Sequence, residues 1–202
     1  IQETQLPFLK DVFTAWLERD DGADFAEQRI AVKERCKGLK EIWEQPFMVT
    51  YDVRDAIDMK RIIKETLIPK AKYFGFEVKL FSIGQHILEY LSNYPDKDEL
   101  LDDSYSEDEI FESLAVETQE TKWMEKAILD FQEQVKTAEH PLIVVTDLEM
   151  LHPLYKMGLI ENTIYNKITV PILVLYPGEA QGFAKRFLNF YNLDGNYRSK
   201  NF

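Results

Sequence analysis

Apolar residues repeat at two different spacings along this chain, and each spacing predicts a different kind of element. Within residues 1–44, apolar side chains three and four positions apart predict two helices, which we expect to form a helical hairpin. Phe13 and Trp16 lie on the apolar stripe of the first helix. They fit either the domain core or an exposed interface, because an amphipathic face serves both purposes.

Strand and helix patterns then alternate over residues 45–202. Short apolar runs predict four strands, at Phe47 to Tyr51, Phe76 to Ile83, Leu142 to Val145 and Ile172 to Tyr176. Helical spacing between them predicts helices over Arg54 to Lys72, Leu88 to Tyr94 and Met124 to Val135. Ser82 with Gln85 forms an S-x-x-Q capping-box pattern for the helix that follows the second strand. Strands that alternate with helices imply right-handed crossovers and a mostly parallel sheet. We therefore predict a Rossmann-like three-layer α/β domain, with residues 196–202 as a short edge strand.

An acidic insertion at residues 95–118 interrupts this alternation. Ser106 and Glu109 form a capping-box pattern that predicts a short helix from Glu107 to Leu114. The segment is either a solvated face or a docking patch for a basic partner, which it would steer over a Debye length of about 8 Å. The acids of this candidate patch are Asp98, Glu99, Asp102, Asp103, Glu107 and Asp108.

Composition narrows the classes of protein to consider. A chain of 202 residues buries about 70% of its unfolded surface, so we expect one domain with an appendage. No apolar run reaches the roughly 20 residues of a membrane helix, the first residues lack a secretory signal, and a lone Cys36 fits a reducing compartment. We therefore expect a soluble cytoplasmic protein. The net charge of −12 opposes direct nucleic-acid binding, which would need a local basic patch such as Lys60, Arg61 and Lys64.

The strand that ends at Thr146-Asp147 is similar to the acid-tipped strand that holds Mg²⁺ in P-loop ATPases. The phosphate-binding motif G-x-x-x-x-G-K-[ST] of that class does not occur in the sequence. We therefore expect Asp147 to cap a following helix with its carboxylate, with Gly158 as the stop of that helix.

After the last predicted strand, Pro177, Gly178 and Gly182 indicate a tight turn or a backbone-amide nest for an anion. We expect a helix to follow, with Phe183, Phe187 and Phe190 on one face. Lys185 and Arg186 would then draw an anion to the turn or be solvated.

The three histidines, His86, His140 and His152, occur singly, and this spacing predicts no zinc site. His152 follows the third strand and is a candidate acid or base, although no recognised nucleophile motif accompanies it. We assign no catalytic residue, metal or cofactor. Tyr197 and Arg198 have the composition of an interface pair, while Arg198 would equally pair with an internal carboxylate such as Asp147.

Four blocks from about Trp43 onward together resemble the BrxB family of BREX phage-defence systems. They are the strand end at Tyr51, Asp52 and Arg54, the stretch GFEVKLFSIGQHI, the strand end Thr146-Asp147-Leu148, and VPILVLYPGE followed by DGNYR. The last block is the most specific, and its matching positions are Tyr176, Pro177, Gly178, Asn196, Tyr197 and Arg198. This chain has Asn-Tyr-Arg where a doubled tyrosine is common in the family.

The resemblance implies a small cytoplasmic component of a bacterial defence assembly. Its expected partners are the alkaline-phosphatase-like protein PglZ, a large ATPase and a DNA methyltransferase. Our leading hypothesis is a noncatalytic adaptor or scaffold that binds PglZ. The alternative is a degenerate nucleotide-binding or hydrolytic enzyme without a P-loop. The candidate ligand or partner site consists of Asp147, His152, Tyr176, Gly178, Gly182, Asn196, Tyr197 and Arg198.

Overall fold

The computed structural model describes residues 46–73, 76–95, 98, 105–181, 184–195 and 200–201. The expected N-terminal hairpin and the domain boundary at residue 44 lie outside the described residues. In chain order the strands are β1 (Phe47–Tyr51), β2 (Glu77–Ser82), β3 (Pro141–Thr146), β4 (Ile172–Gln181), β5 (Ala184–Phe187) and β6 (Lys200–Asn201). All four predicted strands are present, and the edge strand predicted within residues 196–202 is confirmed by β6.

Helices connect these strands. They are α3 (Ala56–Ile62), α4 (Ile68–Tyr73), α5 (Ile83–Ser92), α7 (Glu107–Thr121), α8 (Trp123–Val135) and α9 (Met157–Ile164). A 3₁₀ turn (Val53–Asp55) precedes α3, a π turn (Ile63–Leu67) joins α3 to α4, and a second 3₁₀ turn (Leu148–Leu151) follows β3. The π turn comes just before Pro69, which lacks the N–H that a regular helix would use there.

The sheet has the order β2-β3-β4-β1-β6, and all neighbours on this path are parallel. The register is set by long-range pairs such as Phe47 with Leu173 and Phe81 with Val145. β5 pairs antiparallel with the extended end of β4. The prediction of a mostly parallel Rossmann-like α/β domain is therefore confirmed.

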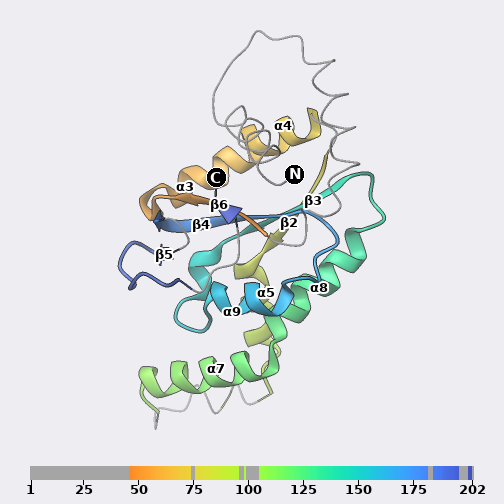
Figure 1. Ribbon diagram of the computed structural model, residues 1–202. Helices are drawn as coiled ribbons and strands as arrows, with labels where there is room; N and C mark the ends of the chain where they lie inside the picture. Colours follow the sequence, from red (N-terminus) through yellow and green to blue (C-terminus); the bar gives the residue numbers. More distant parts are fainter. Residues whose placement is uncertain are drawn as a thin grey trace.

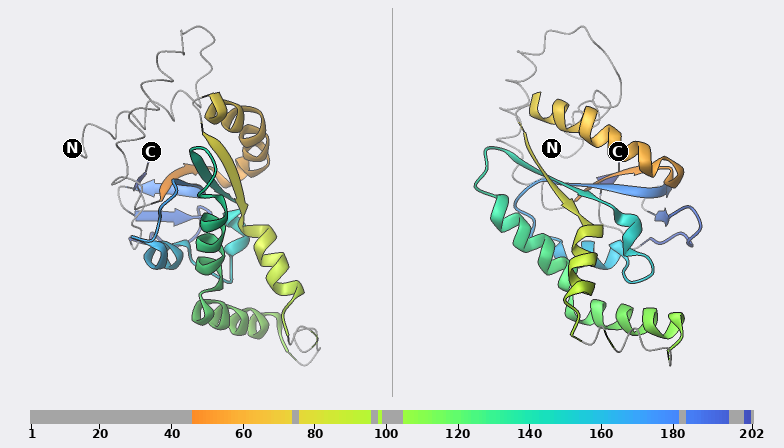
Figure 2. Two further views of the ribbon diagram at one scale, coloured as in Figure 1. Left: turned by 90° about the vertical axis from the view of Figure 1, so that its right-hand side faces the viewer. Right: turned by 180° about the vertical axis from the view of Figure 1, so that it is seen from behind.

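Helices cover both faces of the sheet, with α3 and α4 on one face and α5, α8 and α9 on the other (Figure 1). Alternate strand residues supply the two cores. Phe47, Val144 and Leu175 pack with α3 and α4, while Met48, Val145 and Val174 pack with α8 and α9. α7 lies farthest from the sheet, beyond α5 and α8, in all three views (Figure 2).

Both predicted helix starts are confirmed. Ser82 caps α5 by accepting a hydrogen bond from the backbone N–H of Gln85. Ser106 and Glu109 form both bonds of the capping box at the start of α7. α7 continues past the expected end at Leu114, because Thr118 occupies the next inward position and donates its hydroxyl back to the carbonyl of Leu114.

The helix predicted after Pro177 and Gly178 is wrong. β4 runs straight through both residues, and the chain then returns as β5, so an anion-binding nest at a helix start does not exist there. The phenylalanine spacing that indicated a helix has another cause, because Phe187 faces inward from β5 and packs against Tyr176. Positive φ angles at Leu188 and Asn189 then end the strand.

The single helix expected over residues 146–158 is also wrong. The 3₁₀ turn ends before His152, Pro153 follows, and α9 starts separately at Met157. Gly158 is buried inside α9 and does not stop a helix.

Candidate functional site

Polar side chains from three strand ends meet at the carboxyl edge of the sheet. The Asp147 carboxylate, just after β3, accepts hydrogen bonds from Ser82 at the end of β2 (2.6 Å) and from Thr146 (3.1 Å). Its other oxygen lies 3.1 Å from the amine of Lys60 on α3. The predicted capping role is therefore wrong. Asp147 has a left-handed backbone (φ 59°) that turns its carboxylate toward Ser82 and Lys60.

Two opposing effects act on this carboxylate. Burial disfavours its charged form, but the hydrogen bonds from Ser82 and Lys60 outweigh that cost and hold the pKa of Asp147 below its usual range. Tyr51 lies in the same cluster, and burial together with the charge of Glu149 raises the pKa of its hydroxyl. We conclude that this cluster holds α3 and the 3₁₀ turn Leu148–Leu151 against the edge of the sheet.

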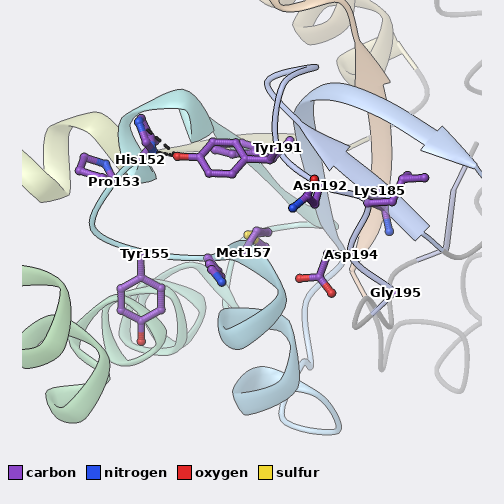
Figure 3. Close-up of a pocket in the computed structure, with 12 residues that line it drawn as sticks. His152, Pro153, Tyr155, Met157, Lys185, Tyr191, Asn192, Asp194 and Gly195 are labelled. Carbon is purple, nitrogen blue, oxygen red and sulfur yellow. Dashed lines mark hydrogen bonds between the residues drawn. The ribbon is translucent and has the colours of Figure 1, made fainter. Parts of the chain in front are cut away.

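A separate cavity of about 440 Å³ opens beside the β4–β5 hairpin. Its wall comes from the segment before α9, from the start of α9, from β5 and from the segment after β5. The lining residues are His152, Pro153, Tyr155, Lys156, Met157, Lys185, Phe187, Tyr191, Asn192, Leu193, Asp194 and Gly195. Figure 3 shows that the Tyr155 ring points away from the other labelled residues, and its hydroxyl donates to the buried Glu125.

His152 is placed in this cavity by ring contacts. Its imidazole is hydrogen-bonded to the Tyr191 hydroxyl, and the two rings are 5.1 Å apart between centroids in an edge-on arrangement (Figure 3). Phe190 approaches the same imidazole edge-on at 5.9 Å. The candidate histidine thus belongs to an aromatic cluster.

Lys185 is the least exposed polar group of the lining. The residue is 1% exposed, so of the two alternatives left open for Lys185 the solvated side chain is wrong. Burial lowers the pKa of its amine, and the charge of Glu161 on α9 acts in the opposite direction without cancelling the shift. Backbone hydrogen bonds of 2.9 Å in both directions join Lys185 to Asp194 and fix this part of the wall.

The structure does not bring the predicted site residues into one cavity. Asp147 and His152 lie in separate places, the one in the strand-edge cluster and the other in the large cavity. Tyr176 is fully buried in the core. Gly178 has a structural reason to be glycine, because its φ is +144° and an added Cβ would lie 2.1 Å from the carbonyl oxygen of Arg186. Gly182, Asn196, Tyr197 and Arg198 lie outside the described residues.

The acidic patch is described only in part. Asp98, Glu107 and Asp108 are exposed, the last two in the first turn of α7, while Glu99, Asp102 and Asp103 lie outside the described residues.

Sequence reasoning missed the contribution of the segment after β5. Tyr191, Asp194 and the buried Lys185 carry no motif spacing, and they meet His152 only because β5 folds back along β4. The pattern Ala184, Lys185, Arg186, Phe187 offers one weak signal, since its alternation also fits a short strand.

The described part of the chain contains neither a cluster of metal ligands nor a membrane-spanning helix. Within it, no three His, Cys, Asp or Glu side chains gather in a way that would hold a metal ion. None of the described helices is both long and apolar enough to cross a membrane.

Comparison with models of protein families shows the family to which this chain belongs. The family model described as BREX protein BrxB matches residues 76–202, well over half of the sequence. The chain belongs to the BrxB family. The match includes β2 to β6, and so contains both the strand-edge residue Asp147 and the whole lining of the cavity. No curated protein and no solved structure matches the chain. Membership in the BrxB family identifies it as a component of a BREX phage-defence system.

Proposed function

We propose that this BrxB-family protein is a noncatalytic adaptor that binds the PglZ-like protein of its BREX system and links it to the large ATPase and the methyltransferase. The observation that carries the proposal is the surface of α7. This helix has six acidic residues and no lysine or arginine, and only Leu114 and Thr118 of its fifteen residues are buried. Such a surface suits a basic partner.

The position of α7 favours docking. It projects from the helical layer on the side away from α3 and α4, so a partner reaches it without meeting the sheet (Figures 1 and 2). Glu107, Asp108 and Glu112 are exposed over its first turns, and Phe111 and Val116 add exposed apolar area, with 43% and 53% of their surface accessible. Acidic groups around apolar contacts are the composition of a polar-rimmed interface.

α7 is held firmly enough to present this surface in one orientation. The hydroxyls of Tyr90 and Tyr94 both donate to the carboxylate of Glu117, the first at 3.0 Å. Tyr90 also stacks on Trp123 at the start of α8, with ring centroids 4.5 Å apart. Burial and the hydrogen bond to Glu117 raise the pKa of Tyr90, so its hydroxyl stays a donor at neutral pH. A preformed surface loses less entropy on binding.

The test compares binding of the purified PglZ-like protein from the same operon to wild type and two triple variants. The first, Glu107→Gln/Asp108→Asn/Glu112→Gln, removes three charges from α7. The matched control, Asp55→Asn/Asp130→Asn/Glu179→Gln, removes three exposed charges elsewhere. We expect the α7 variant to lower the association rate about tenfold at roughly 50 mM salt, because charge steering is strongest there, and the control to bind like wild type.

The two parts of the proposal fail separately. If wild type forms no complex with the PglZ-like protein at low salt, the adaptor role is wrong. If all three proteins bind with equal rates, the adaptor role stands and α7 is not its docking surface.

A further inference from the structure

The cavity lined by His152, Tyr191 and Lys185 lies where open α/β sheets bind ligands. It opens past the carboxyl end of β3, beside the β4–β5 hairpin and next to the start of α9. Its volume of about 440 Å³ falls within the range of small-molecule sites, roughly 300–1,000 Å³. Nothing in the proposed docking of α7 uses this space, so the cavity calls for a function of its own.

The lining of the cavity carries two lysines that suit an anion. The buried Lys185 and the exposed Lys156, which precedes the first residue of α9, both contribute to the lining. The N-terminus of α9 borders the cavity beside Lys156, and the partial positive charge of a helix start favours a negative group there. Asp194 also lines the cavity. Burial lowers the pKa of Lys185, and the charge of Glu161 on α9 does not cancel that shift. An added anion would therefore stabilise the ammonium form.

Another part of the lining is aromatic. Tyr191 stands between Phe187 and Phe190, with ring centroids 5.9 Å and 4.5 Å away. Phe190 is 67% exposed and lies edge-on to His152, outside the lining of the cavity. Figure 3 shows Tyr191 on one side of the space and Met157 at the start of α9 on the other. A flat ring between them would pack against the partly exposed Tyr191.

We propose that this cavity binds a small organic anion that carries a flat aromatic ring, with the anionic group at Lys185 and Lys156 and the ring against Tyr191. Nucleoside monophosphates and aromatic carboxylates share this chemistry. The strand-edge acids around Asp147 take no part, because they lie in a separate cluster.

The experiment is titration of the purified full chain by calorimetry and by changes in tyrosine fluorescence. Four probes separate the two halves of the ligand: adenosine monophosphate, indole-3-carboxylate, adenosine and inorganic phosphate. Each is carried to about 10 mM, where even millimolar affinity would saturate the site. We expect one or both of the ring-bearing anions to bind saturably, and adenosine and phosphate to bind at least tenfold more weakly.

Variants locate the site. Lys185→Met removes the charge and keeps an unbranched, slightly shorter side chain, and Lys156→Ala removes the charge of an exposed lysine. Each substitution should raise the dissociation constant of the ring-bearing anion about tenfold, which is the usual effect of losing a charged contact. Lys126→Ala on α8 removes another exposed lysine, one that does not line the cavity, and should bind like wild type.

Three results would overturn the proposal. The first is no saturable binding of any probe to wild type. The second is phosphate or adenosine binding as tightly as the ring-bearing anions. That result would show that the site recognises only the anionic group or only the ring. The third is binding that survives both Lys156→Ala and Lys185→Met, which would place the ligand elsewhere.

Discussion

Replacing Gly178 with alanine tests the β4–β5 hairpin that builds one wall of the cavity. The Gly178 φ of +144° is a conformation that side chains rarely adopt, and such strain costs about 1–3 kcal/mol. The added Cβ would also lie 2.1 Å from the backbone oxygen of Arg186, and relieving an overpacked contact costs typically about 1–3 kcal/mol more. Because the obstacle is backbone, a side-chain rotation cannot remove it.

We therefore expect Gly178→Ala to lower the free energy of unfolding by about 4 kcal/mol, which for a chain of this size lowers the melting temperature by roughly 8–16 °C. Urea denaturation followed by tryptophan fluorescence measures the first quantity and a thermal scan the second. The matched control is Gly195→Ala, because an added Cβ there meets no atom within 4 Å. It should change stability by less than about 0.5 kcal/mol.

The reasoning would be refuted by a loss below about 1 kcal/mol in Gly178→Ala. That result would mean that β5 does not approach Gly178 at Arg186, and that the cavity wall is built differently. A large loss in both variants would instead show a general intolerance of this segment to substitution.

Two further predictions concern the half-buried Asp147 and the buried Glu125. Asp147→Asn should cost about 1 kcal/mol at pH 7, since it weakens the bond to Lys60. The folded-state pKa of Asp147 is depressed, so its contribution is full above the ordinary value of 3.8 and is lost as the pH falls through the folded value. Urea unfolding at pH 7 and near pH 3 should therefore show a difference between wild type and variant that shrinks in acid; an equal difference at both pH values would contradict it. Tyr155→Phe should cost about 2–3 kcal/mol, because Glu125 is 2% exposed and would lose the hydroxyl that donates to both of its oxygens. Tyr155→Phe/Glu125→Leu should recover part of that loss in the same assay, and no recovery would mean that this hydrogen bond contributes little.

The elements that the sequence predicts best are those whose pattern is local. The run from Leu142 to Val145 is apolar at every position, and it forms a strand buried on both faces. The caps at Ser82 and Ser106 follow from side chains three residues apart, so they too are visible in the sequence. Strand order is different, because it depends on which distant segments pair, and no local signal places β1 beside β4.

The prediction around Gly178 shows why the site was harder to foresee than the fold. Proline and glycine after an apolar strand normally mark a turn, yet here both residues continue β4 and the glycine permits the close approach of β5. Asp147 was expected to bond to its own following helix, but its partners Ser82 and Lys60 are more than sixty positions away in the chain. Tertiary contacts of this kind leave no spacing to recognise.

The place of β1 in the sheet has a consequence for how the chain folds. Phe47 pairs with Leu173 on one side and with Lys200 on the other, so both neighbours of β1 are synthesised more than a hundred residues later. Contacts between such distant segments form slowly, and until they form the apolar edge of β1 is a template for aggregation. A ribosome-bound chain that stops before β4 can pair β2 with β3 but leaves β1 without either partner. We therefore expect premature termination to yield an aggregating fragment, and the nascent protein to depend on chaperones until β4 emerges.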